Sequence, residues 1–119
     1  MLGWEVYIRR KNESESNDPR DDIAKWNTSV YGLYWIDDLV NTGDAINLGG
    51  NGYPNRYSIK AGLFRSILNK GIPSHNSRPI IGEDYYLPAG YNSPLQVNND
   101  ILNKCPDYEE LIVTAWDLS

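Results

Sequence analysis

The sequence predicts an α+β fold in which a small sheet packs against two main helices. Two observations carry this prediction: the chain begins and ends with strand-like segments, and two segments between them have apolar residues at helical spacing. With 119 residues, the chain has the length of one domain, so we expect residues 1–119 to form a single globular domain. Four Trp and nine Tyr supply large side chains for its core.

The two ends of the chain carry the strand signals. In GWEVYIRR, residues 3–10, Trp4, Val6 and Ile8 alternate with polar or charged residues, which is typical of a half-buried strand. EELIVTAW, residues 109–116, is rich in β-branched and apolar residues and predicts a central strand. If these strands pair, they share one sheet that includes the N-terminal and C-terminal strands, and the chain ends lie close together.

The first half of the chain predicts a loop, a short helix and the first main helix. KNESESNDPRDD, residues 11–22, has the composition of a loop, and we expect Asp21 or Asp22 to cap a short helix through Trp26. VYGLYWIDDLV, residues 30–40, has apolar residues at helical spacing and predicts a main helix that stops at 41–43. DAINLGG, residues 44–50, then reads as a short strand or an extended link.

The second main helix is expected to begin after Ser58, which we interpret as its cap. Ile59, Leu63 and Ile67 would form the apolar stripe of this helix, and Gly71 would end it. Residues 72–97 contain four of the seven prolines, so we expect a long Pro/Tyr-rich loop with a brief extended piece at 78–87. A short helix at 98–105 follows.

Charge and cysteine content exclude several classes of function. The formal charge of −5 repels phosphate backbones and anionic lipid, so we expect neither nucleic acid nor a membrane as a partner. A single cysteine, Cys105, excludes an internal disulfide and a cysteine-based zinc site. Because the N-terminal segment is charged early and no apolar run reaches membrane-spanning length, we expect a cytoplasmic protein.

The glycine-rich stretch NLGGNGYPNRYSIKAG, residues 47–62, allows two interpretations. It matches neither the P-loop nor the dinucleotide-binding spacing, and Asn-Gly is a strong turn dipeptide, so a tight turn is favoured. The alternative is a cradle for an anionic ligand at the start of the following helix. The residues of this alternative ligand site are Gly50, Asn51, Gly52, Tyr53, Arg56 and Tyr57, with His75 as a distant contributor.

No pattern in the sequence predicts a metal, a cofactor or a catalytic group. Asp37 and Asp38 are adjacent on a predicted helix and point about 100° apart, so they do not share one ion easily. No EF-hand spacing is present either. A dyad of Cys105 and His75 has no local signature, so we assign no catalytic residue.

Tyrosines and acids in the Pro/Tyr-rich loop suggest a surface for a basic protein partner. Tyr anchors protein interfaces, and neighbouring carboxylates complement a basic surface. The predicted partner-binding residues are Glu83, Asp84, Tyr85, Tyr86 and Tyr91. The other interpretation of these tyrosines is that they cover the sheet and hold the loop down.

In size, acidity and aromatic content the chain resembles small immunity proteins that block bacterial toxins, which implies an inhibitor that binds a basic protein. Two other functions stay open. One is a small enzyme or ligand-binding domain built on the glycine-rich turn, and the other is a structural homodimer subunit, which an unpaired edge strand would favour.

Overall fold

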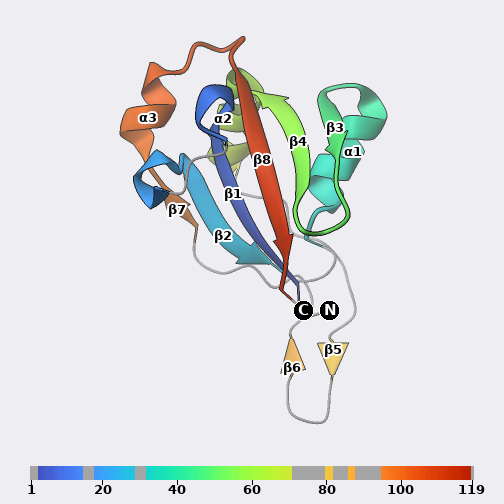
Figure 1. Ribbon diagram of the computed structural model, residues 1–119. Coiled ribbons are helices and arrows are strands. Elements are labelled where there is room, and N and C mark those ends of the chain that lie inside the picture. Colours follow the sequence, from blue (N-terminus) through green and yellow to red (C-terminus); the bar gives the residue numbers. More distant parts are fainter. Residues whose placement is uncertain are drawn as a thin grey trace.

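The computed structural model describes residues 3–14, 18–28, 32–70, 80–81, 86–87 and 95–118. Six of the described strands form an antiparallel sheet in the order β3-β4-β8-β1-β2-β7 (Figure 1). Its strands are β1 (Trp4–Arg10), β2 (Ala24–Thr28), β3 (Ala45–Gly49), β4 (Asn55–Lys60), β7 (Gln96–Val97) and β8 (Glu110–Asp117). β5 (Ile80–Ile81) and β6 (Tyr86–Leu87) pair separately.

The predicted pairing of the two terminal strands is confirmed. β8 lies between β4 and β1, and it pairs antiparallel with β1 from Trp4–Asp117 to Arg10–Leu111. The Leu118 N–H donates to the Gly3 carbonyl at 3.0 Å, so both ends of the described chain lie side by side (Figure 1). A near-continuous apolar sequence therefore occupies the centre of the sheet, where both neighbouring strands shield its backbone from water.

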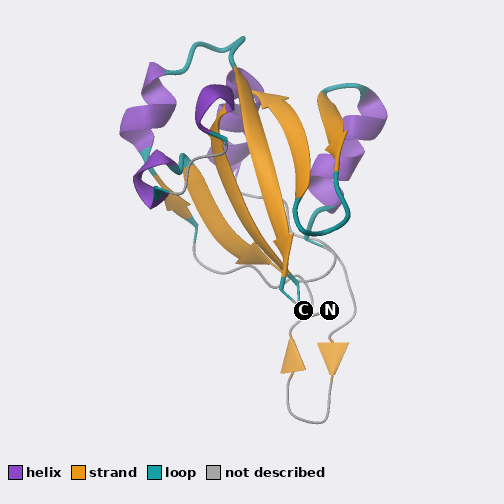
Figure 2. Ribbon diagram, in the orientation of Figure 1, coloured by secondary structure: helices purple, strands orange, loops and turns teal. Residues whose placement is uncertain are grey.

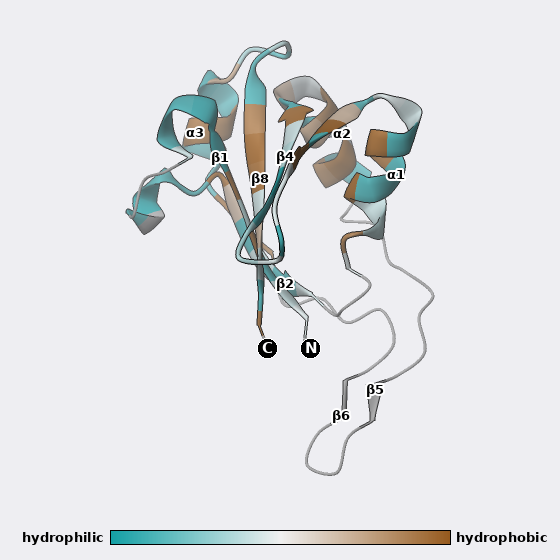
Figure 3. Ribbon diagram, turned by 45° about the vertical axis from the view of Figure 1, so that its right-hand side comes forward, coloured by the Kyte–Doolittle hydropathy of each residue, from teal (hydrophilic) through white to brown (hydrophobic). Residues whose placement is uncertain are grey.

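The helices α1 (Tyr34–Thr42) and α2 (Ala61–Lys70) lie behind the sheet on one face and the shorter α3 (Asn99–Lys104) lies beside the β2–β7 edge (Figure 2), which confirms the α+β prediction. Two 3₁₀ turns, η1 (Lys11–Glu13) and η2 (Pro19–Asp21), precede β2. Inward residues of β1, β4 and β8 form one core cluster with Ile36 of α1, Phe64 of α2 and Leu102 of α3. The apolar middle of β8 marks this core in Figure 3. We call the other side of the sheet the open face.

The end of α1 confirms its predicted stop. Gly43 adopts the left-handed conformation with φ +85°, and its N–H bonds to the carbonyls of Leu39 and Val40. Only glycine reaches this conformation without steric cost, so Gly43 ends the helix and turns the chain directly into β3. α1 begins only at Tyr34, with Leu33 as its N-cap, so the predicted start was too early at Gly32 and Leu33, while residues 30–31 lie outside the described residues.

The predicted start of the second main helix was wrong by two residues, because a cap at Ser58 would begin the helix at Ile59 and α2 begins at Ala61. Ser58 and Ile59 belong to β4, where Ile59 pairs with Leu111 and is 1% exposed. The Ala61 N–H donates to the Glu109 carbonyl, so the strand ladder ends where α2 begins. A buried strand residue and a buried helix residue look alike in sequence, and no loop residue separates the two elements.

The short helix expected through Trp26 was also wrong. Ala24, Trp26 and Thr28 are buried in β2 while Asn27 is exposed, which is the alternation of a strand. β7 was missed, because two residues next to a proline-rich stretch give no pattern of their own. The extended piece at 78–87 corresponds to β5 and β6, and the helix at 98–105 is confirmed by α3. No helix in the described ranges is long and apolar enough to cross a membrane.

Candidate functional site

The glycine-rich stretch forms the hairpin connection between β3 and β4. Gly49, Gly50 and Gly52 have positive φ values, and the Tyr53–Pro54 peptide bond is cis. A side chain at Gly50 would collide with the Pro54 carbonyl oxygen, so this position accepts only glycine. These backbone features build a tight turn between two strands.

Two N–H groups of this turn are bonded to its own side chains. The Gly52 N–H donates to Asn55 Oδ1 at 2.8 Å, and the Tyr53 N–H donates to Asn51 Oδ1 at 3.2 Å. The helix start on which the anion-cradle hypothesis depended lies beyond β4, at Ala61. Because the first N–H groups of α2 donate to the Glu109 and Asp107 carbonyls, they are bonded within the fold.

The other residues of the predicted ligand site point in different directions. Tyr57 is buried on the helix face, and its hydroxyl donates to Asp37 Oδ1 at 3.3 Å. Burial and the nearby Asp37 carboxylate raise the pKa of Tyr57 to about 12. Arg56 pairs with Thr114 on the open face, whereas Tyr53 is 57% exposed on the turn. His75 lies outside the described residues, so ligand binding at this turn stays a prediction.

The predicted partner-binding residues fall almost entirely outside the described residues. Glu83, Asp84, Tyr85 and Tyr91 lie there, and Tyr86 is described only as part of β6, where it pairs with Ile81. Their role in binding stays a prediction.

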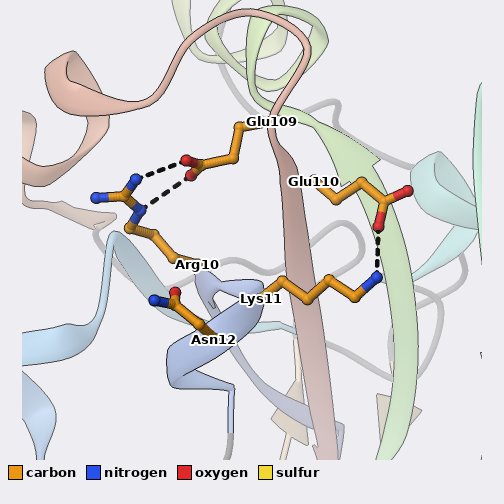
Figure 4. A pocket seen from close by; sticks show the side chains of 5 residues that line it. All are labelled: Arg10, Lys11, Asn12, Glu109 and Glu110. Carbon is orange, nitrogen blue, oxygen red and sulfur yellow. Dashed lines mark hydrogen bonds and ion pairs between the residues drawn. The ribbon is translucent and has the colours of Figure 1, made fainter.

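A hollow of about 400 Å³ lies where β1 ends and β8 begins (Figure 4). Arg10 makes a two-pronged ion pair with Glu109, with N–O distances of 3.0 and 2.6 Å. Lys11 Nζ lies 3.0 Å from Glu110 Oε2. These opposite charges neutralise each other, so the hollow carries little net charge for a ligand to recognise.

The acid–base state of this region does not favour nucleophilic chemistry. Hydrogen bonds from Arg10 lower the pKa of Glu109 below its usual value. Burial of Cys105, with the Glu109 carboxylate close by, raises the pKa of its thiol to about 11. The thiolate is the reactive form of cysteine, so Cys105 acts as a protonated core residue at neutral pH.

A connected set of polar and aromatic side chains crosses the open face over β1 and β8. Trp116 Nε1 donates to the Tyr7 hydroxyl at 3.0 Å, and the Arg9 guanidinium lies 4.6 Å from the centre of the Tyr7 ring. Arg9 also donates to Asp22 at 2.6 Å, and both side chains are largely buried. These contacts stabilise the middle of the open face.

The largest concentration of exposed apolar side chains lies on α1 and the β3–β4 hairpin. Of the eight large hydrophobic residues exposed in the described part of the chain, four belong to this region. They are Tyr34, Ile46, Leu48 and Tyr53, each of them between 52% and 57% exposed. Exposed apolar side chains on neighbouring elements at one edge of a sheet can contribute to one binding surface.

The same region is acidic. Residues 32–55 contain Asp37, Asp38 and Asp44 and no Lys or Arg, and all three acids are exposed. We call the exposed residues of this region the α1–β3 surface: Tyr34, Asp37, Asp38, Asp44, Ile46, Leu48 and Tyr53. It combines apolar contact area with a charge of −3 from these three acids, and the cation that borders it beside Asp44 and Ile46, Lys60, lies 3.9 Å from Glu110.

Sequence reasoning missed this surface although its residues were visible. Ile46 and Leu48 alternate with Asn47, so both point to the same face of β3. Their exposure follows from the position of β3 at the edge of the sheet. Strand order is not encoded in the local pattern, so the alternation alone did not distinguish a buried face from an exposed one.

No protein-family model, curated protein or solved structure matches this chain. Among the residues that the structure describes, no three His, Cys, Asp or Glu side chains are grouped as a metal site requires. The functional argument therefore depends on the geometry and charge of the α1–β3 surface.

Proposed function

We propose that this protein is a small acidic protein-binding module that docks onto a basic partner through its α1–β3 surface. The observation that carries the proposal is the concentration of half-exposed apolar side chains in a segment with three exposed acids and no cation. Apolar anchors supply the affinity of protein interfaces, while complementary charge steers the encounter and selects the partner.

The size and net charge of the chain support an immunity-type inhibitor of a basic protein as the form of this module. A single cysteine fits a reducing compartment such as the cytoplasm. The predicted Tyr-rich segment around Tyr85 would then extend the contact.

Charge reversal on α1 tests the proposal. The tagged protein, immobilised and exposed to lysate of its own source, is expected to capture a basic protein that is released at high salt. Asp38→Lys should reduce this capture by about tenfold, because it places a cation in the acidic surface. Captured protein is quantified by mass spectrometry at matched bait amounts.

Asp100→Lys is the matched control, since Asp100 is also an exposed helical aspartate but lies on α3. It changes the net charge equally and should leave capture within about twofold of wild type. Equal loss with both variants would show that net charge alone binds the partner, and no loss with Asp38→Lys would refute the proposed surface.

A further inference from the structure

The alternation of hydrogen-bonded and non-hydrogen-bonded residue pairs in the sheet determines which backbone groups of β3 face outward. The Ala61 N–H donates to the Glu109 carbonyl, and these residues continue the β4–β8 register. In an antiparallel ladder, bonded and non-bonded pairs alternate, so Tyr57 and Ile59 direct their backbone groups toward β8. Ser58 consequently directs its backbone N–H and C=O groups toward β3.

The same alternation continues into β3. Ser58 pairs with Ile46, so Ile46 bonds to β4, while Ala45 and Asn47 point their N–H and C=O groups away from the sheet. Within the described residues, no hydrogen bond from outside the hairpin reaches those groups. Ala45 is buried, but residues 46–49 are exposed, so the free edge is centred on Asn47.

This edge lacks most of the features that usually prevent strand addition. Residues 45–49, AINLG, carry no charge and no proline, and the blunting feature they do have is the bulge between Asn47 and Gly49. An added strand could pair with the backbone of Asn47 before the bulge.

The two flanks of the edge differ in chemistry. Ile46 and Leu48 point to the open face, while α1 lies against β3 on the helix face and carries two exposed acids, Asp37, which accepts a hydrogen bond from Tyr57, and Asp38. Successive residues of an added strand would alternate between these surroundings. Every second residue would lie beside apolar side chains, and those between would lie on the side of α1, which carries exposed acids.

From this arrangement we infer that the β3 edge binds an extended segment of the partner protein in which apolar and basic residues alternate. The inference rests on the proposed function and specifies how the partner binds: as an added strand whose backbone bonds to the N–H and C=O of Asn47. Apolar side chains of the segment pack beside Ile46 and Leu48, and its Lys or Arg residues face the acids of α1.

Charge argues against a second copy of this chain as the added strand. Two β3 edges could pair through their backbones, but pairing would bring together the acids of residues 32–55 of each copy, and the neighbouring Lys60 already lies 3.9 Å from Glu110. Like charges at an interface disfavour the complex. A basic segment neutralises the same acids.

Substitutions at Asn47 test the role of the outward N–H. Asn47→Pro removes this donor, whereas Asn47→Ala keeps it; both remove the side chain that accepts from the Gly49 N–H at 2.7 Å. The probe is a short fluorescent peptide of alternating lysine and valine, with binding followed by anisotropy. Asn47→Ala should bind it within about threefold of wild type, and Asn47→Pro should bind at least about tenfold more weakly.

A peptide of the same composition with its lysines grouped together should bind wild type more weakly than the alternating peptide. Equal binding of both peptides, or equal affinity of the Pro and Ala variants, would overturn strand addition. Analytical ultracentrifugation provides a further outcome: a wild-type dimer that Asn47→Pro dissociates would assign the edge to a second copy and overturn the inference.

Amide exchange tests the inference without relying on the fold of a variant. In the free protein, the outward Asn47 N–H should exchange much faster than the Ile46 N–H, and the alternating peptide should slow it by at least about tenfold. Unchanged exchange at Asn47 under saturating peptide would overturn strand addition. If Asp38→Lys still reduces partner capture by about tenfold in that case, the proposed function survives and only the binding mode fails.

Discussion

Replacing Phe64 with alanine is expected to lower the free energy of unfolding by about 3–5 kcal/mol. Phe64 is fully buried where α2 packs against the sheet, and it belongs to the core cluster that joins the helices to β1, β4 and β8. Truncation removes a large apolar side chain and leaves a cavity that the surrounding strands cannot close. Urea unfolding followed by circular dichroism measures the change.

Ser66→Ala serves as the control, because Ser66 is exposed on the same helix. Its effect should stay within about 0.5 kcal/mol of wild type. A loss of less than about 1 kcal/mol for Phe64→Ala would contradict the packing of α2 on the sheet.

The second large effect is expected on binding. Joint replacement of Ile46 and Leu48 by asparagine should weaken the complex with the captured partner by at least about thirtyfold. Both side chains are more than half exposed in the free protein, so their loss removes contact area from the complex and little from the fold. Isothermal titration measures the affinity, and thermal unfolding should show similar Tm values for the variant and wild type.

Joint replacement of Leu95 and Tyr108 by asparagine provides the comparison. These exposed apolar residues lie outside the α1–β3 surface, at 37% and 77% exposure. Their variant should bind within about twofold of wild type. Equal weakening by both variants would mean that exposed apolar area in general, and not this surface, determines the affinity.

The parts of the fold that were predictable are those with long, regular patterns. β1 alternates from Trp4 to Ile8, and β8 is a short apolar run rich in β-branched residues, which favours a strand over a helix. α1 combines helical spacing with a glycine stop, and Gly43 adopts the expected left-handed conformation. These patterns are local, so they predict the strand or helix without knowledge of the elements that pack beside it.

The errors occurred where a local pattern has two interpretations. Ile59 lies at helical spacing from Leu63, yet it completes β4, because the chain passes from strand to helix without a loop. Acids before Ala24 resemble a helix cap, but β2 is selected by pairing with β1. Pairing with a neighbouring strand decides whether such a segment becomes a strand or a helix, and the neighbouring strand is distant in sequence.

The candidate surface was hidden for a related reason. The sequence marks Ile46 and Leu48 as apolar and Asp38 and Asp44 as charged, but their common location follows from β3 being an edge strand next to α1. Conversely, Tyr57 looked like part of an exposed glycine-rich site and is a core residue. Exposure is a property of the assembled sheet, so single residues did not reveal it.

The most direct test of the central claim is amide chemical-shift mapping of the labelled protein with its captured partner. The account predicts the largest changes at Asp38 and across residues 44–49, with smaller changes around the Arg10–Glu109 ion pair. Changes centred on that ion pair, on β2 and β7, or on the Tyr-rich segment near Tyr86, with residues 44–49 unaffected, would contradict it.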